Sequence, residues 1–386
     1  MDGKTLLFAL LGIAVCGAPV TEEIKAACTN KGLEVVYAMA AHHDLAHLVG
    51  VALGKMNIPL GEDGKKYKNA AMAAFARYMQ QNYAFEQTCA ALEDAKIPFI
   101  PLKGSVLRAY YPEPWLRTSC DMDILVREED LDVATRVLTE KLSCTYEGKT
   151  SHDVGLLIPG GVHLELHYST IEDYVSQSAQ QILTDVWNAA KPAPGKRYHM
   201  VMPDALFYFY HIAHMAKHFL YGGCGIRPFL DLWIMDEKIA GDPVARQELL
   251  ERGDLLTFAC AMHKLSRVWF SGERRDAAAE QTEQFVLKGG TYGTLETYVT
   301  VNQAQEGNKL RYVLSRVFLP YDVIKHYYPV LQKHKWLTPL YQVVRWFKIA
   351  FGGGADHAIR ELQVNAATSQ DAIGSIAQLL QDLGLK

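Results

Sequence analysis

Apolar residues recur at helical spacing through residues 1–95, most clearly in an alanine-rich stretch that contains Met72, Phe75, Met79 and Tyr83. The chain starts with an apolar run, Leu6–Val15, that is too short to span a membrane. The residues before this run carry little positive charge, which is not typical of a signal peptide. We therefore expect an N-terminal helical region over residues 1–95, with a buried first helix.

The spacing changes at residue 98, where short apolar runs separated by turn residues replace the helical pattern. The predicted order is strand 98–102, turn 103–105, helix 106–110, strand 121–126, helix 130–141 and a hairpin of 155–158 with 162–168. This order predicts a compact α+β unit between helical regions.

Helical spacing returns at Asp204, with a long helix predicted to about Leu220, a glycine-rich break, and further helices over 228–270 and 280–350. The last thirty-odd residues open on three glycines and predict a partly loose tail. The pattern thus divides the chain into an N-terminal helical region, an α+β core, a C-terminal helical domain and a tail, with bounds 1–95, 96–195, 196–350 and 351–386.

The composition argues against some classes of binding partner. The 386 residues carry a formal net charge of −4, which gives no general surface for a polyanion, so no extended nucleic-acid track is expected. Seven scattered cysteines without a Cys-x-x-Cys pair are typical of reduced thiols in a cytoplasmic protein. No stretch reaches eighteen uninterrupted apolar residues, so no membrane partner is expected either.

Three acidic residues on two predicted strands form the candidate metal site. Asp121 and Asp123 are two apart in a strand, so their side chains share one face. In the later strand, Glu165 lies on the polar side with His163 and His167. Neighbouring carboxylates repel each other unless a cation lies between them, and a hard ion such as Mg²⁺ prefers oxygen ligands. The pattern predicts that the three acids converge on divalent cations.

A glycine-containing turn precedes these acids. Gly104 and Ser105 stand where a predicted strand passes into a helix, and a helix N-terminus with a glycine is suited to bind phosphate. Lys103 and the Ser105 hydroxyl are expected to add phosphate contacts, and Arg117 is a second candidate for neutralising a triphosphate.

The run PLKGSVLRAYYPEPWLRTSCDMDILV, followed by VHLELHY, resembles the nucleotidyltransferase superfamily that includes DNA polymerase β. Within it, the chain is similar to a poorly characterised bacterial nucleotidyltransferase family marked by Leu-Lys-Gly and Arg-x-x-x-Asp-x-Asp. Gly104 and Ser105 match the turn of the superfamily, Asp121 and Asp123 its acidic pair, and Glu165 its third carboxylate. The fifteen residues between Ser105 and Asp121 exceed the usual spacing, and the extra length could form part of an acceptor pocket.

The resemblance implies a polymerase β-like core, a mixed sheet with flanking helices. It also implies a Mg²⁺-dependent enzyme that moves a nucleoside monophosphate from an NTP such as ATP to a hydroxyl, releasing pyrophosphate. Two Mg²⁺ ions are expected, with Mn²⁺ as the alternative. The acceptor is open between a small molecule, an RNA and a protein. Replacing Asp121 or Asp123 by alanine is expected to abolish turnover and to leave the thermal midpoint unchanged or raised.

A later segment, HMAKHFLYGGCGIRPFLDL, also resembles the family and offers further nucleotide-binding candidates, Lys217 and Arg227. The structural alternative for Arg227 is an ion pair with Asp231, four residues on. A zinc site of His211, His214 and His218 is a weaker alternative, because no cysteine or acid stands at ligand spacing.

Other interpretations stay open beside the enzyme. A glycosyltransferase also uses Asp-x-Asp, but it would need a longer nucleotide-binding sheet upstream. A non-catalytic module could bind a nucleotide or a partner without reaction. His163 and His167 are expected to be half-exposed strand residues, and the aromatic-rich stretch 321–351 to be a packed helical pair rather than a nucleic-acid surface.

Overall fold

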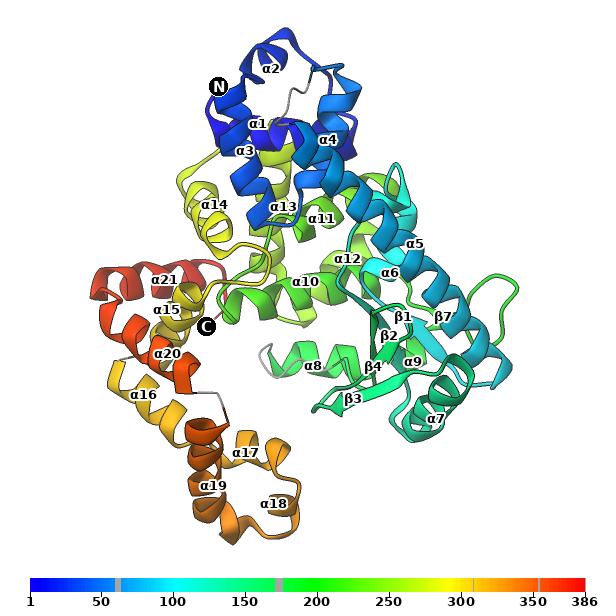
Figure 1. Ribbon diagram of the computed structural model, residues 1–386, viewed down its shortest axis with the longest axis vertical. Helices are drawn as coiled ribbons and strands as arrows, with labels where there is room; N and C mark the ends of the chain where they lie inside the picture. The colour runs from blue at the N-terminus through cyan, green and yellow to red at the C-terminus, as the bar shows by residue number, and fades with distance from the viewer. Residues whose placement is uncertain (60–63, 171–175, 308, 353–354, 386) are drawn as a thin grey trace. The chain divides into compact units, whose positions relative to one another are not determined.

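The computed structural model of the protein describes residues 1–59, 64–170, 176–307, 309–352 and 355–385. Its helices and strands fall into two compact units (Figure 1). Unit 1 comprises Met1–Lys217 with Gly225–Leu287, and unit 2 comprises His218–Cys224 with Lys288–Lys386. The division at residues 95, 195 and 350 stays a prediction.

The first part of unit 1 is helical, as predicted. Its elements are α1 (Gly3–Leu11), the π-helical turn η1 (Gly12–Cys16), α2 (Glu22–Ala27), α3 (Asn30–His42), α4 (Ala46–Lys55) and α5 (Gly64–Asp94). Asp2 caps α1 by accepting a hydrogen bond from the Thr5 N–H at 2.7 Å. Leu7, Leu10 and Leu11 are fully buried where α1 packs against α3 and α4. The expectation of a buried first helix is confirmed.

Helix α5 is present where predicted, but its large apolar stripe faces outward. Met72, Phe75, Met79 and Tyr83 are 71%, 50%, 52% and 67% exposed. The inner face instead carries small residues, among them Ala74, Ala84 and Ala91, which let neighbouring helices and the sheet approach closely. Helical spacing shows that the large apolar residues of α5 share one face. The face that packs is nevertheless the one with small side chains, because their low volume allows close contact.

Unit 1 contains a mixed five-stranded sheet. Its strands are β1 (Phe99–Pro101), β2 (Asp121–Val126), β3 (Thr145–Lys149), β4 (Asp153–Ile158) and β5 (Val162–His167). The order is β1-β2-β5-β4-β3; β2 and β5 pair in parallel and the other neighbours are antiparallel. The predicted hairpin is β4 with β5, and Gly160 and Gly161 turn it with φ of 98° and 84°. The sequence did not indicate β3, because this edge strand is mostly exposed and has no apolar face.

Helices cover one face of the sheet. They are α5 and α7 (Leu131–Leu142), and α7 contributes Leu131, Ala134 and Leu138 to the core. The buried strand residues Met122, Ile124, Val126, Val154, Leu156, Leu164 and Leu166 join the same cluster. Each of the larger side chains in it contributes about 1.5–3 kcal/mol by leaving water. Because side chains alternate along a strand, this packing leaves the polar residues of β2 and β5 on the opposite face. The α+β prediction is confirmed.

Short elements link the strands to the later helices of unit 1. They are α6 (Gly104–Leu107), the 3₁₀ turns η2 (Arg108–Tyr110), η3 (Pro114–Leu116) and η4 (Glu128–Asp130), α8 (Gln177–Thr184), α9 (Val186–Ala189), and the strands β6 (Lys191–Pro192) and β7 (Met200–Val201). The helices that follow are α10 (Asp204–Leu220), α11 (Arg227–Lys238), α12 (Pro243–Arg252), α13 (Leu256–Phe270) and α14 (Ala277–Gly289). Helix α10 has the predicted bounds. Within the described ranges, no helix is long and apolar enough to cross a membrane.

Unit 2 is helical. It contains α15 (Leu295–Glu306), α16 (Lys309–Val317), α17 (Tyr321–Tyr327), α18 (Val330–Lys333), the 3₁₀ turn η5 (Lys335–Leu337), α19 (Thr338–Phe351), α20 (Ala355–Ala367) and α21 (Gln370–Asp382). The expectation of a loose tail is wrong for the described part of that segment. Ile373, Leu379 and Leu380 of α21 are buried, and α21 packs against α15. This helix was not predicted because the three glycines at the start of the segment are typical of irregular chain.

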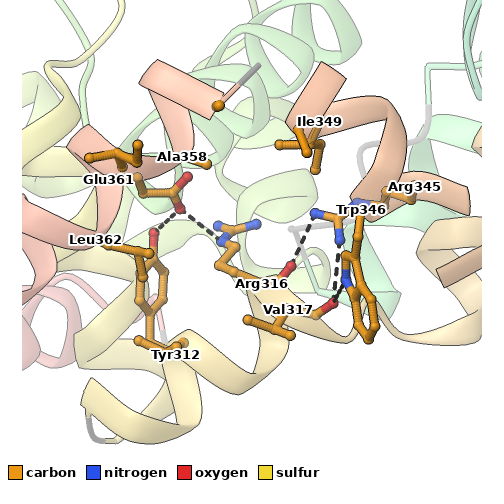
Figure 2. A pocket seen from close by; sticks show the side chains of 13 residues that line it. Tyr312, Arg316, Val317, Arg345, Trp346, Ile349, Ala358, Glu361 and Leu362 are labelled. Carbon is orange, nitrogen blue, oxygen red and sulfur yellow. Dashed lines mark hydrogen bonds and ion pairs between the residues drawn. The ribbon is translucent and has the colours of Figure 1, made fainter. Parts of the chain in front are cut away.

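The aromatic stretch of unit 2 is less packed than expected. Trp336, Phe347 and Phe351 are 77%, 61% and 83% exposed, although Tyr328 and Tyr341 do contact each other. A largely apolar cavity of about 420 Å³ is lined by residues of α16, α19 and α20. In Figure 2 its charged groups bind one another or the backbone: Arg316 pairs with Glu361 at 3.3 Å, and Arg345 donates to carbonyl groups of α16.

Gly223 and Gly293 of unit 2 must both be glycines or nearly so, because their backbones lie very close together. A Cβ on Gly223 would lie 2.3 Å from the Cα of Gly293, a contact that the backbone must move to avoid. Gly223→Ala should therefore lower the free energy of unfolding by about 1–3 kcal/mol, the usual cost of overpacking. Gly374→Ala is the matched control, since Gly374 is exposed in α21 with nothing near its Cβ position and should gain about 0.5–1 kcal/mol. Chemical denaturation of both variants measures the difference; equal stabilities would contradict the assignment.

Candidate active site

The polar face of β2 carries the predicted acidic pair. Asp121 is half-buried at the start of the strand, and Asp123 is 4% exposed. Met122 and Ile124 point into the core on the other side, so the alternation places both carboxylates on one face, as the sequence predicted.

The third acid lies on the neighbouring strand. The parallel register of β2 and β5 places Asp123 opposite Glu165, and Glu165 is 39% exposed at its side chain. Among the residues that the structure describes, Asp123, Glu165 and His167 form a group whose ligand atoms lie within 4.8 Å of one another. Asp121 is outside that group, yet it is near enough for Asp123 and Glu165 to raise its pKa, in addition to the larger effect of burial. The acidic side chains of β2 and β5 thus lie close together because of the register in which the two strands pair.

Lys103 lies against the acidic pair rather than pointing outward. Its Nζ is 2.9 Å from Oδ1 of Asp123. The residue adopts a φ of 46° and ψ of −120°, a conformation that costs energy in any residue with a Cβ. Burial would lower the pKa of Lys103, but the Asp123 carboxylate outweighs it and holds that pKa above its usual value. The sequence suggested a phosphate contact for Lys103, and the structure adds this ion pair to it.

His167 completes the cluster. Its Nε2 lies 2.9 Å from Oδ1 of Asp123 and 3.3 Å from Oε2 of Glu165, and the residue is 5% exposed. Burial lowers its pKa, but the hydrogen bonds to both carboxylates raise the pKa of His167 to about 9. The expectation of a half-exposed histidine is wrong here. It is right for His163, which is 55% exposed and pairs with Glu147 at 3.0 Å.

The charge balance of the cluster suits a divalent cation. Burial raises the pKa of Asp123, but Lys103 and His167 lower it far more, so Asp123 is fully ionised. Three carboxylates then face at most two cationic side chains, Lys103 and His167. The cluster retains negative charge on oxygen atoms, the donor set that Mg²⁺ and Mn²⁺ prefer. The residues present therefore fit the metal that the resemblance implies.

The Gly104–Ser105 turn stands directly after Lys103. Gly104 is buried, and a Cβ there would lie 3.2 Å from Nη1 of Arg117, which is tighter than nearly all real contacts. The Ser105 N–H donates to the carbonyl of Leu102 at 3.2 Å, so this amide already serves the turn. The Ser105 side chain lines a mostly apolar cavity of about 490 Å³ bounded in part by Phe85 and Tyr110. Lys103, not Gly104, has the positive φ.

Arg117 is held in a buried ion pair. Its Nε and Nη2 each lie 2.8 Å from a carboxylate oxygen of Asp231, which is 1% exposed and also accepts the Tyr111 hydroxyl at 2.7 Å. Burial raises the pKa of Asp231, but Arg117 lowers it further, so the pair stays charged. The Arg117 guanidinium is thus bound to Asp231 and lies beside Gly104. No spacing along the sequence indicates this partner, 114 residues away.

The remaining candidates lie on the helices after the sheet. Arg227 begins α11, and its Nη2 is 2.7 Å from Oδ2 of Asp44, so the alternative of an Arg227–Asp231 pair is wrong. Lys217 is half-buried on α10. In the zinc alternative, His211 is already bonded: its Nε2 lies 3.0 Å from the carbonyl oxygen of Pro228.

A mixed sheet that joins an Asp-x-Asp strand to a parallel strand bearing a third acid, beside a Gly-Ser turn, defines a protein of the nucleotidyltransferase class. The comparisons with known proteins agree. The chain belongs to the family described as uncharacterised nucleotidyltransferase, which matches residues 30–271.

Other comparisons add little. The solution structure of the antibiotic-resistance factor ANT(2'')-Ia is 12% identical, with 54% of this chain and 98% of that chain covered and a TM-score of 0.27. That score is too low for the likeness to bear on fold or function. No curated protein matches the sequence.

Proposed function

We propose that the protein is a Mg²⁺-dependent enzyme that transfers a nucleoside monophosphate from an NTP to the hydroxyl of an acceptor and releases pyrophosphate. The observation that carries the proposal is the parallel register that sets Asp123 opposite Glu165, with Asp121 two residues along the same face. Family membership supports the same class of reaction.

Asp121, Asp123 and Glu165 would hold the metal, two Mg²⁺ ions by the resemblance. The metal would neutralise the triphosphate and make the acceptor hydroxyl easier to deprotonate. Lys103 and His167 keep Asp123 anionic and fix its orientation, since both donate to the same oxygen, Oδ1. One of the carboxylates would accept the proton of the hydroxyl.

The nucleotide would lie over the turn. Lys103, Gly104 and Ser105 are the proposed contacts of the β- and γ-phosphates, with Lys217 and Arg227 as further candidates from the helices. Arg117 would act indirectly, because its guanidinium is bound to Asp231 and occupies the space beside Gly104 that a side chain there would need. The rest of the acceptor could occupy the cavity beside Ser105, whose lining is mostly apolar.

The test is to incubate the protein with each labelled NTP and Mg²⁺, with and without a cell-extract metabolite mixture, and to measure pyrophosphate and the label on products or on the protein. We expect release of pyrophosphate with transfer of the labelled NMP, and its loss on chelation of the metal. Glu165→Gln, which preserves shape and removes one charge, should lose the activity, whereas His163→Gln, on the same face of β5, should keep it. NTP binding without pyrophosphate under all these conditions would instead indicate a non-catalytic module.

A further inference from the structure

A second group of metal-ligating side chains lies next to the acidic cluster. Among the described residues, His152, Asp153 and His167 present ligand atoms that all lie within 4.8 Å of one another. The group differs in chemistry from the first: it offers two imidazole nitrogens and one carboxylate, whereas the nucleotidyltransferase cluster is dominated by carboxylate oxygens.

The sheet holds two of these residues in place. Asp153 begins β4 and is the direct antiparallel partner of His167 on β5, so their side chains share the polar face of the sheet. Asp153 and His167 are 7% and 5% exposed. Their proximity is therefore fixed by strand register and does not depend on a flexible loop.

The turn before β4 brings in the third residue. The Thr150 hydroxyl accepts the N–H groups of His152 and Asp153 at 3.3 and 3.2 Å, and the His152 carbonyl accepts the Tyr168 N–H at 2.9 Å. His152 is thus tied to both ends of the hairpin. Its imidazole stacks on that of His167, with ring centroids 5.8 Å apart and an angle of 28° between the planes.

Each of the two histidines has one ring nitrogen next to an oxygen that can accept its proton. Nε2 of His152 is 3.0 Å from Oδ2 of Asp153, while Nδ1 lies 3.3 Å from the Ser151 hydroxyl, which can accept its proton. Nε2 of His167 donates to the carboxylates of Asp123 and Glu165, so a cation in this group would take Nδ1 and displace the proton that the ring otherwise carries there. A metal-bound histidine whose second nitrogen donates to a carboxylate is the usual arrangement, because it fixes the tautomer and makes the ligand more basic.

We propose that His152, Asp153 and His167 bind a borderline divalent cation, Zn²⁺, at a site that adjoins the proposed Mg²⁺ cluster through His167. Two nitrogens and one carboxylate suit Zn²⁺ better than Mg²⁺, which prefers oxygen. Three protein ligands leave one position for water or a ligand, and the His152 side chain, 33% exposed, places that position within reach of solvent. The cation would fix the turn before β4 to β5 and orient His167 toward Asp123 and Glu165. This site is independent of whether the chain transfers nucleotides.

The test measures metal binding to the whole chain without any assay of activity. The protein is stripped of metal and titrated with Zn²⁺ by calorimetry, in excess Mg²⁺ to occupy the acidic cluster, and with Co²⁺ as a probe whose visible absorption reports nitrogen ligands. We expect one Zn²⁺ per chain, a Co²⁺ spectrum typical of imidazole ligation, and a rise of the thermal midpoint on Zn²⁺ addition.

Two variants and a control decide where the cation binds. His152→Ala, a change in a partly exposed turn, should weaken Zn²⁺ binding by at least about tenfold and abolish the thermal effect. His163→Ala removes an exposed histidine of the same strand face that lies outside the group, and should leave binding unchanged. Glu165→Gln should also retain Zn²⁺ binding, even if it abolishes nucleotide transfer.

Two outcomes would overturn the proposal: no Zn²⁺ bound by the wild-type chain, or binding unaffected by His152→Ala. Binding that is kept in His152→Ala and lost in Glu165→Gln would place the cation in the acidic cluster. A chain that binds Zn²⁺ as expected but shows no pyrophosphate release would remove the proposed transferase function and leave this site standing.

Discussion

Replacing Asp231 by alanine should lower the free energy of unfolding by about 3–5 kcal/mol, the usual cost of removing one partner from a buried ion pair. Asp231 is 1% exposed and accepts hydrogen bonds from Arg117 and the Tyr111 hydroxyl. Without the carboxylate, the Arg117 guanidinium, 10% exposed, keeps its charge in a site with little water. Urea denaturation monitored by circular dichroism measures the loss.

A matched control separates this effect from the loss of any carboxylate. Glu129 pairs with Arg127 at 3.8 Å, but both side chains are largely exposed, so Glu129→Ala should cost no more than about 1 kcal/mol. Replacing the pair together, with Arg117→Met and Asp231→Leu, should recover part of the stability because no charge is left buried. A cost below about 1 kcal/mol for Asp231→Ala alone would show that water reaches Arg117.

This ion pair explains how a helical segment supports the candidate active site. Arg117 comes from the segment between the turn and β2, and Asp231 comes from α11. The same guanidinium lies beside Gly104, so the pair places the predicted phosphate turn next to a helix more than a hundred residues away in sequence. Arg227 makes a second link from α11, to Asp44. The helices around the sheet therefore fix the geometry of the turn.

The sequence could predict strands β1, β2, β4 and β5 and the three acids because both depend on local rules. Alternation along β2 and β5 decides which side chains share a face, and packing against α5 and α7 decides which face is buried. Once the hairpin of β4 and β5 lay beside β2, Glu165 could reach the acidic pair. The one local signal that was undervalued is His167, two residues from Glu165 on the same face of β5.

The partners of the charged residues could not be predicted because they are set by tertiary packing. Lys103 and Arg117 both stand where phosphate binding was expected, yet Lys103 contacts Asp123 and Arg117 contacts Asp231. Spacing along one helix suggested an Arg227–Asp231 pair, but each residue binds an element far away in sequence. The exposure of the large apolar face of α5 could not be predicted for the same reason, since helical spacing alone does not show which face meets the sheet.

Asp121→Asn and Asp123→Asn should both reduce metal-dependent NTP turnover by at least about 10²–10³-fold, the scale of losing one preorganised electrostatic group. Their effects on stability should differ in sign. Asp121 is half-buried among like charges, so neutralising it should leave the thermal midpoint unchanged or raised, as the sequence suggested. Asp123 instead balances Lys103 and His167, so its replacement by asparagine leaves two buried cationic groups without the negative charge that they share.

For Asp123→Asn we therefore expect a loss of about 3–5 kcal/mol, which revises the sequence-based expectation of no loss. Denaturation in the presence of a chelator isolates this effect from any stabilisation by bound metal. Lys103→Met combined with Asp123→Asn should cost less than the sum of the two single changes, because each single change leaves the other group unpaired. Equal shifts for Asp121→Asn and Asp123→Asn would contradict the assignment of Lys103 and His167 to Asp123.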